Sequence, residues 1–392
     1  MRVGVYLEAG YYKEGEKLFC EDIYTVLLNR LSQEKGISFS FLGRQYACKK
    51  ENMYLLDRYD RFFELTPFRD LVDLCIRWPR LKRENKATFS AFVQNVDILL
   101  VMSPMPICIE LVKLAGKYGK PVVLLARQDT RRVLPQRYGG IKKILATILA
   151  YLFEWQVERL VAKQDITVMA LGSRIANRFS LFTDKVHYIS TSPYRLSDIV
   201  LPESMLPVDW SRPIKLLFVG RVEVNKGFTE LLECLSGEMP FDWRLTIVGD
   251  GAFMPEVKRL IGRYGIAEKV ELMGFVPFGP DLMKQYRSHD IFVLPSYSEG
   301  LPQVVLEAMA GGCLVLASNV GGIPDVVNSG HTGLLFAPKS IDELSKAFMY
   351  VYRHQAEVES MRLEALNVAR KYAFENQIEI LGKALLTNKN KR

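Results

Sequence analysis

Short apolar runs of strand length alternate with longer segments of helical period along most of the 392-residue chain. The runs are rich in β-branched residues, and an unbroken apolar run is typical of a parallel strand that is buried on both faces. The alternation therefore predicts repeated βα units and a mainly parallel sheet. Because the pattern occurs once in each half of the chain, we expect an α/β protein with two doubly wound domains.

A proline-rich segment separates the two sets of candidate strands. It spans residues 201–213 and holds three prolines, which disfavour both helix and central strand. We predict an N-terminal domain over 1–200, a linker over 201–213, a C-terminal domain over 214–373, and a final helix and tail over 374–392. Two such domains would form a cleft at the carboxyl ends of their sheets, where open α/β folds bind ligands.

Positive charge is concentrated in the first half. Residues 1–200 carry 31 Lys and Arg against 21 Asp and Glu, whereas residues 201–392 carry 21 against 23. This excess predicts an anionic partner: a membrane surface, a phosphate-bearing acceptor or nucleic acid. Nucleic acid is the least favoured and is not expected as a partner, because no recognition element or interleaved aromatic and basic motif accompanies the charge.

A cationic stretch from Arg127 to Lys143 precedes the apolar run Ile144–Phe153. The run is far shorter than the roughly 20 residues of a membrane-spanning helix, so no span is expected. Two interpretations stay open: peripheral docking on an anionic leaflet, or a core helix with a solvated basic start. A second basic cluster near Trp78 would join the first, and its members are Arg77, Arg80, Lys82, Arg83 and Lys86.

The cysteines and the amino terminus point to the cytoplasm. Six cysteines are scattered without a close pair at metal-ligand spacing, so we expect reduced thiols and no metal site. Glu8 interrupts the first apolar stretch before it reaches the length of a signal-peptide core. We therefore expect a cytoplasmic protein, with the inner membrane leaflet as a candidate peripheral location.

The strongest chemical signal is the segment Pro295–Gly312, which follows the predicted strand Ile291–Leu294. Pro302 suits a first helical turn, so Glu299 is expected in the loop before a helix and Glu307 inside it. In the alternative interpretation, Glu299 is only a charge near the helix N-terminus, and Glu307 is a solvated or packed carboxylate. The apolar and glycine-rich flanks favour instead a buried helix that a ligand approaches closely.

The start of this helix would suit an anion. Backbone N–H groups around Gly300, Leu301 and Gln303 would point at a phosphate, with assistance from the helix dipole. Glu307 could hold a ribose diol by paired hydrogen bonds.

Glycine turns follow two earlier predicted strands. After the strand Lys215–Val219, Gly220 precedes the cations Arg221 and Lys226, which could clamp a diphosphate. A solvated pair of loop charges is the alternative interpretation. After the next strand, the turn Gly249–Gly251 would let a nucleotide approach the backbone.

These motifs resemble the retaining, nucleotide-sugar-dependent glycosyltransferases of family 4, which are group 1 glycosyltransferases. The resemblance covers about residues 214–340. The two family glutamates, separated by seven residues, match Glu299 and Glu307, and the phosphate-binding cations match Arg221 and Lys226. Further matches are Gly249–Gly251, Gly274-Phe275-Val276 and Gly321–Asp325.

The resemblance implies the GT-B fold, in which two Rossmann-like domains face a cleft. It implies a UDP- or GDP-sugar donor, no bound cofactor or metal, a glycan or lipid-linked acceptor, and a final helix that packs back on the first domain. Glu299 would contact the transferred sugar and Glu307 the ribose. The expected catalytic residues are Glu299, Arg221 and Lys226. The expected donor-binding residues are Gly220, Gly249, Gly251, Phe275, Val276, Gly300, Leu301, Pro302 and Glu307.

The first half matches the family more loosely. Members carry adjacent glycines after the first strand, here predicted over Val3–Leu7, whereas Gly10 and Gly15 are separated in this chain. Many members also place a His after the fourth strand, where this chain has Gln128 and Asp129. Gly15, Gln128 and Asp129 are therefore the acceptor-side candidates, without a transferred histidine role.

The expected reaction moves a sugar to an acceptor hydroxyl with retention of configuration, in bacterial surface polysaccharide or glycolipid synthesis. Arg221, Lys226 and the helix start would stabilise the departing diphosphate. Glu299 is expected to orient the sugar rather than to attack it. The alternative is a nucleotide-sugar epimerase or hydrolase on the same scaffold, which would release product without an acceptor.

Overall fold

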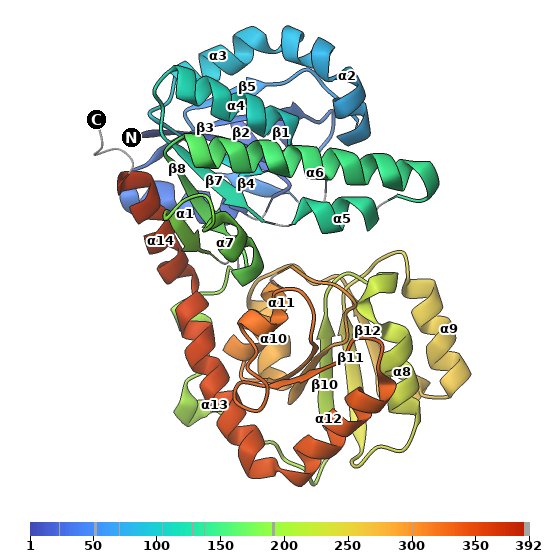
Figure 1. Ribbon diagram of the computed structural model, residues 1–392. Helices are drawn as coiled ribbons and strands as arrows, with labels where there is room; N and C mark the ends of the chain where they lie inside the picture. The colour runs from blue at the N-terminus through green and yellow to red at the C-terminus, as the bar shows by residue number, and fades with distance from the viewer. Residues whose placement is uncertain are drawn as a thin grey trace. The chain divides into compact units, whose positions relative to one another are not determined.

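The chain divides into two compact units. A computed structural model describes residues 1–22, 24–50, 53–69, 71–103, 105–127, 129–136, 138–189, 193–300 and 302–387. The first unit contains residues 1–191 together with the end of the chain from Gln377, and the second contains residues 192–376. Figure 1 colours the chain from blue to red, so that both units can be traced.

Six parallel strands form the sheet of the second unit, in the order β12-β11-β10-β13-β14-β15. Every residue of β13 and β14 is buried, as expected for apolar strands with helices on both faces. The strand order reverses at β10, which pairs with both β11 and β13. The strands are β10 (Ile214–Val219), β11 (Trp243–Val248), β12 (Val270–Gly274), β13 (Ile291–Leu294), β14 (Leu314–Ser318) and β15 (Leu334–Phe336).

Helices cover both faces of this sheet (Figure 1). Helix α8 contacts α9 and α12, while α11 contacts α10 and α13. Their bounds are α8 (Phe228–Ser236), α9 (Met254–Tyr264), α10 (Pro280–Ser288), α11 (Gln303–Ala310), α12 (Ile341–Arg353) and α13 (Gln355–Tyr372). The second unit is therefore a doubly wound, three-layered α/β domain.

The first unit has a nine-stranded sheet that is parallel apart from the pairings of β2 with β1 and β4. Its path is β4-β2-β1-β6-β7-β8-β9, with β3 beside β1 and β5 beside β3. The strands are β1 (Arg2–Glu14), β2 (Lys17–Cys20), β3 (Ser38–Gln45), β4 (Tyr54–Leu56), β5 (Arg61–Glu64), β6 (Ile98–Ser103), β7 (Val122–Ala126), β8 (Ile166–Ala170) and β9 (Val186–Tyr188).

One expectation for the first strand was wrong. It does not end near Leu7 before a ligand loop, because β1 continues to Glu14 and forms an antiparallel hairpin with β2. Gly15 lies at the tip of this hairpin. Gly10, which resembles a loop residue in the sequence, instead leaves room for the ring of Tyr46, which a Cβ atom would overlap.

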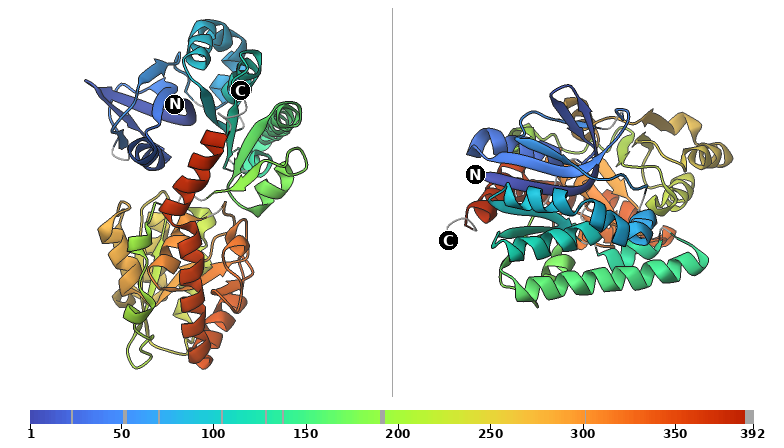
Figure 2. Two further views of the ribbon diagram at one scale, coloured as in Figure 1. Left: turned by 90° about the vertical axis from the view of Figure 1, so that its left-hand side faces the viewer. Right: turned by 90° about the horizontal axis from the view of Figure 1, so that it is seen from above.

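Helices pack on the first sheet as well, and Figure 2 shows them from two further directions. They are α1 (Tyr24–Lys35), α2 (Leu71–Glu84), α3 (Lys86–Gln94), α4 (Pro106–Lys117), α5 (Thr130–Gln136), α6 (Gly140–Lys163) and α7 (Ser173–Phe179). The last helix, α14 (Phe374–Thr387), belongs to this unit from Gln377 onward and buries Leu381 and Leu385. Among the described residues, none of the helices combines the length and apolarity that a membrane crossing requires.

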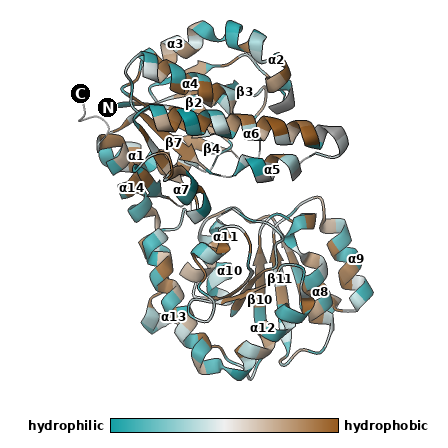
Figure 3. Cartoon of the chain, viewed as in Figure 1, coloured by the Kyte–Doolittle hydropathy of each residue, from teal (hydrophilic) through white to brown (hydrophobic). Residues whose placement is uncertain are grey.

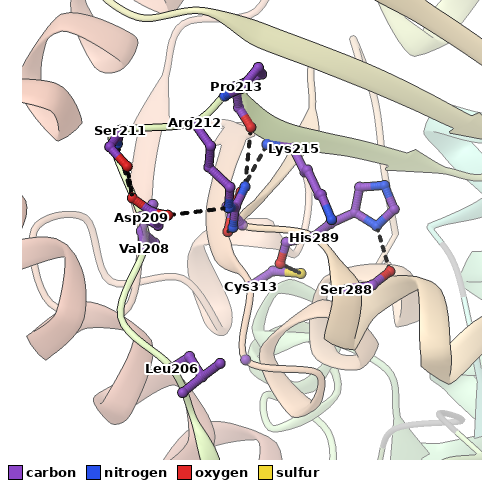
Figure 4. Close-up of polar contacts among 12 residues, drawn as sticks. Leu206, Val208, Asp209, Ser211, Arg212, Pro213, Lys215, Ser288, His289 and Cys313 are labelled. Atoms are coloured by element: carbon purple, nitrogen blue, oxygen red, sulfur yellow. Dashed lines mark hydrogen bonds and ion pairs between the residues drawn. The ribbon is translucent and has the colours of Figure 1, made fainter.

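The division between the units differs from the predicted boundary, because the proline-rich segment 201–213 belongs to the second unit. Figure 4 shows the segment around Asp209 and Arg212. The two Nη atoms of Arg212 contact both carboxylate oxygens of Asp290, at 2.9 and 2.8 Å. Arg362 also donates to the carbonyl oxygen of Leu206 at 3.0 Å. Prolines keep this segment irregular, but its polar contacts hold it on the domain that follows.

Candidate active site

Two charged side chains far apart in the sequence meet beyond the ends of neighbouring strands. Lys226 follows β10 and Glu299 follows β13. The Nζ atom of Lys226 lies 2.6 Å from Oε1 of Glu299, and each side chain is only 12% exposed. Because the strand order reverses between β10 and β13, the pair lies at the topological switch point, where open α/β sheets bind their ligands.

The two loops that carry this pair are joined by their backbones. The amide of Tyr297 donates to the carbonyl oxygen of Asn225 at 2.8 Å. Gly227 has φ of 71° and lies against the Pro295 carbonyl, where a Cβ atom would overlap it. Glycine at this position therefore permits both the left-handed backbone and the close approach of the loops.

A third side chain completes the contacts of Glu299. Ser296 Oγ donates to Oε1 of Glu299 at 2.7 Å, so this oxygen accepts from both Ser296 and Lys226. Ser296 is not among the residues predicted from the sequence to form the site. Its position three residues before Glu299, in the same loop, was the available signal. The carboxylate of Glu299 is thus held in one orientation.

The loop after β14 contacts the backbone of the loop that carries Glu299. Gly322 N donates to the carbonyl oxygen of Gly300 at 2.7 Å. Gly321, with φ of 58°, lies against the carbonyl oxygen of Glu299. The glycine pair of the Gly321–Asp325 motif therefore acts as backbone support for the Glu299 loop.

Glu307 lies inside α11, as predicted, and is only 4% exposed. Tyr286 on α10 donates its hydroxyl to Oε2 of Glu307 at 2.9 Å. Burial raises the pKa of Glu307 to about 7, although the hydrogen bond from Tyr286 opposes the shift. No sequence pattern pointed to Tyr286, because it lies 21 residues before Glu307 and on another helix.

The raised pKa of Glu307 makes the stability of the protein depend on pH. The folded state binds this proton more tightly than the unfolded state, so raising the pH from about 4.5 to about 7 removes stability. A shift from 4.5 to about 7 corresponds to a loss of about 3 kcal/mol. We expect Glu307→Gln to weaken this decline, as measured by urea unfolding at pH 5 and pH 8. An equally steep decline in the variant would contradict the assignment.

Arg221 does not join the Lys226–Glu299 pair in this structure. Its Nη1 contacts Oε1 of Glu223 at 2.8 Å, and its side chain is 77% exposed. An ion pair this exposed contributes little free energy, so the guanidinium can exchange Glu223 for a ligand at low cost.

The remaining predicted donor residues lie at the same edge of the sheet or next to it. Gly220 and Gly249 follow β10 and β11 and lie against each other, while Gly251 packs on the carbonyl of Val222. Phe275, after β12, is 61% exposed. Val276 is half-buried against the core. Pro302 is the residue before the first turn of α11, which begins at Gln303, and Leu301 lies outside the described residues.

The acceptor-side candidates are not brought together as a site. Gly15 lies at the hairpin tip, and Gln128 falls outside the described residues. Asp129 accepts hydrogen bonds from Arg131 at 3.3 Å and from Arg178 at 3.2 Å. Asp129 is therefore engaged by structural arginines of its own unit. Within the described ranges, no group of three or more His, Cys, Asp or Glu side chains is placed to hold a metal ion.

Comparison with known families extends this picture. The family model described as glycosyl transferases group 1 matches residues 209–370, which hold Lys226, Glu299 and Glu307. The matched segment is similar to the group 1 glycosyl transferases and coincides with most of the second unit.

Similarity to individual relatives is partial. The chain is 29% identical to the sulfoquinovosyl transferase of Arabidopsis thaliana over 255 residues, which cover 63% of this chain and 48% of the relative. It is 31% identical over 193 residues to a D-inositol 3-phosphate glycosyltransferase of Rhodococcus opacus, with 47% and 43% of the two chains covered. The chain thus spans less than half the length of these relatives.

Solved structures resemble the whole chain. A sucrose-phosphate synthase from Thermosynechococcus elongatus superposes with a TM-score of 0.69 over 98% of both chains, at 16% identity. HepE of Anabaena, in complex with UDP and glucose, gives a TM-score of 0.66 over 99% of this chain and 100% of its own, at 15% identity. At these identities the likeness concerns the fold, which is the GT-B arrangement of two Rossmann-like domains.

Proposed function

We propose that this protein transfers a sugar from a UDP- or GDP-sugar to an acceptor hydroxyl with retention of configuration, as a member of family 4. The observation that carries the proposal is the Lys226–Glu299 pair at the switch point of the second sheet. The ammonium of Lys226 and the carboxylate of Glu299 suit the two parts of a nucleotide sugar, the diphosphate and the sugar. The cation attracts the diphosphate, and the carboxylate accepts hydrogen bonds from sugar hydroxyls.

The reaction builds negative charge on the departing diphosphate. Lys226, with the N–H groups at the start of α11, would stabilise this charge away from bulk water. Arg221 would leave Glu223 to bind the same group. Glu299 would orient the sugar, since Ser296 and Lys226 fix its carboxylate.

Glu307 is assigned to the ribose of the donor. Tyr286 occupies its Oε2 atom, and we assign the other carboxylate oxygen to the ribose hydroxyls. The glycine turns after β10 and β11 would let the nucleotide approach the backbone. No cofactor or metal is included in the proposal, because lysine, arginine and backbone donors would neutralise the diphosphate.

The acceptor is proposed to be a glycan or a lipid-linked glycan, in bacterial surface polysaccharide or glycolipid synthesis at the cytoplasmic leaflet. The charge excess of the first half supports an anionic acceptor or surface. The UDP donor class is supported by the UDP and glucose bound to the HepE structure, which shares the fold.

A panel of UDP-, GDP- and ADP-sugars tests the donor. We expect one UDP- or GDP-sugar to raise the Tm, because a ligand that binds only the folded state stabilises it by mass action. With that donor, sugar should appear on an added acceptor and not in solution. Acceptor-independent release of a free sugar or an epimer would instead favour the hydrolase or epimerase. Stabilisation by none of these donors would contradict the proposal.

A further inference from the structure

Helix α6 is apolar on its outer side as well as on its inner side. The inner residues Ala146, Ala150, Val157 and Val161 are buried in the first unit, which confirms the core-helix interpretation for that side. Six large apolar residues on the outer side are between 47% and 63% exposed: Ile144, Leu145, Ile148, Tyr151, Leu152 and Trp155. A helix at the surface ordinarily turns polar residues to water. Figure 3 shows the brown colour of apolar residues along much of α6.

These six residues, which we call the outer face, form one continuous stripe. Ile144, Ile148, Tyr151 and Trp155 follow helical spacing, and Leu145 and Leu152 widen the stripe. At 1.5 Å per residue the stripe is about 17 Å long. Helix α6, which carries the stripe, lies along the outside of the first unit (Figures 1 and 2). A contiguous apolar stripe of this kind marks an interaction surface.

The acidic residues of the described part of α6 are buried or nearly so, and they pair with arginines. Glu154 is fully buried and accepts from Arg178 at 2.6 Å. Glu158 is 14% exposed and lies 3.5 Å from both Arg131 and Arg178. The negative charges of Glu154 and Glu158 are therefore paired inside the unit and are not exposed beside the outer face.

Cations, in contrast, border the outer face. Lys143, Arg159 and Lys163 are exposed at its two ends. The guanidinium of Arg159 lies 4.8 Å from the ring centroid of Trp155. Aromatic rings beside arginines suit the headgroup region, where the ring is half-buried and the cation meets phosphate.

We propose that the outer face of α6 docks the protein on an anionic bilayer. The helix would lie in the plane of the headgroups, with its apolar side chains in the acyl boundary and its cations against lipid phosphates. A second copy of the chain fits this surface less well. Two such faces would bring their cations together, and the described part of α6 offers no exposed carboxylate to pair with them.

The second basic cluster adds little to this surface. Three of its five cations pair with carboxylates: Arg77 with Asp73, Arg80 with Glu84, and Lys82 with Glu110. The docking proposal therefore rests on α6.

Vesicle flotation tests the proposal without any assay of sugar transfer. We expect the full-length protein to bind phosphatidylcholine vesicles with about 30% phosphatidylglycerol at least about tenfold better than pure phosphatidylcholine, and less at high salt. The double variant Ile148→Ser/Trp155→Ser should lose at least about tenfold in binding. The control Leu181→Ser/Leu206→Ser removes two residues that are 79% and 80% exposed elsewhere, and should bind like the wild type.

A second variant keeps the apolar stripe and removes charge. Arg159→Gln/Lys163→Gln should lose about tenfold on anionic vesicles and nothing on neutral ones. Circular dichroism and the Tm establish that each variant is folded. Equal binding to both vesicle types, no binding, or unchanged binding by Ile148→Ser/Trp155→Ser would overturn the proposal. A wild-type dimer that this variant dissociates, without vesicle binding, would assign the face to a second copy.

Discussion

Replacing Lys226 with alanine is expected to lower kcat for sugar transfer by about 10²–10³-fold, with the protein still folded. The ammonium of Lys226 is 2.6 Å from Glu299 and only 12% exposed, so its charge would act on the proposed diphosphate with little screening by water. Its loss removes stabilisation of the leaving group and also releases the carboxylate. Initial rates with the identified donor and acceptor measure this effect. Glu299→Ala should cause a loss of similar size.

Lys269 provides the matched control for Lys226. It forms an ion pair of nearly the same length with Asp242, 2.7 Å, in the same unit. Both partners of that pair are exposed, at 45% and 59%, and lie outside the proposed site. Lys269→Ala should leave the rate within about twofold of wild type, since exposed pairs contribute little. A folded Lys226→Ala protein with an unchanged rate would contradict the proposed role.

Replacing Gly321 with alanine is expected to lower both activity and stability. A Cβ atom would lie 1.9 Å from the carbonyl oxygen of Glu299, so the Glu299 loop must move. Overpacking of this kind costs about 1–3 kcal/mol, in addition to about 1 kcal/mol for the left-handed backbone. A displacement near 1 Å at a reacting centre can cost about 10²-fold in rate. Urea unfolding and initial rates measure the two effects.

The variant Gly265→Ala is the control that separates the steric cost of Gly321→Ala from the cost of its left-handed backbone. It ends α9 with φ of 66°, close to the 58° of Gly321, but a Cβ atom there would meet no heavy atom within 4 Å. Gly265→Ala should therefore lose only about 1 kcal/mol and keep its activity. Equal activities for the two variants would show that the Gly321 loop does not position Glu299.

The second half of the fold was predictable because most of its strands are largely apolar runs, of which β13 and β14 are buried throughout. Such runs are typical of parallel strands, and the predicted strands Lys215–Val219 and Ile291–Leu294 lie in the observed sheet. The first half was harder, because β2, β4 and β5 are short, and because β4 and β5 pair with strands distant in the sequence. The continuation of β1 through Gly10 depends on packing with Tyr46, which no local pattern reveals.

The preceding strand and the helix-start signal of Pro302 located Glu299 in a loop and Glu307 in a helix, and the structure has both there. The contact between Lys226 and Glu299 depends on strand order, and no sequence spacing encodes it. Tyr286 meets Glu307 because α10 packs on α11, and no local sequence pattern predicts that packing either. Asp129 was predicted as an acceptor-side residue, but Arg178 on the later helix α7 donates a hydrogen bond to its carboxylate.

A crystal structure of the protein with its nucleotide sugar would test the central proposal most directly. We predict that the diphosphate lies within hydrogen-bond distance of Lys226 Nζ and of the first backbone amides of α11, with the sugar against Glu299. Density for the diphosphate at any other place would contradict the proposed site, however similar the fold.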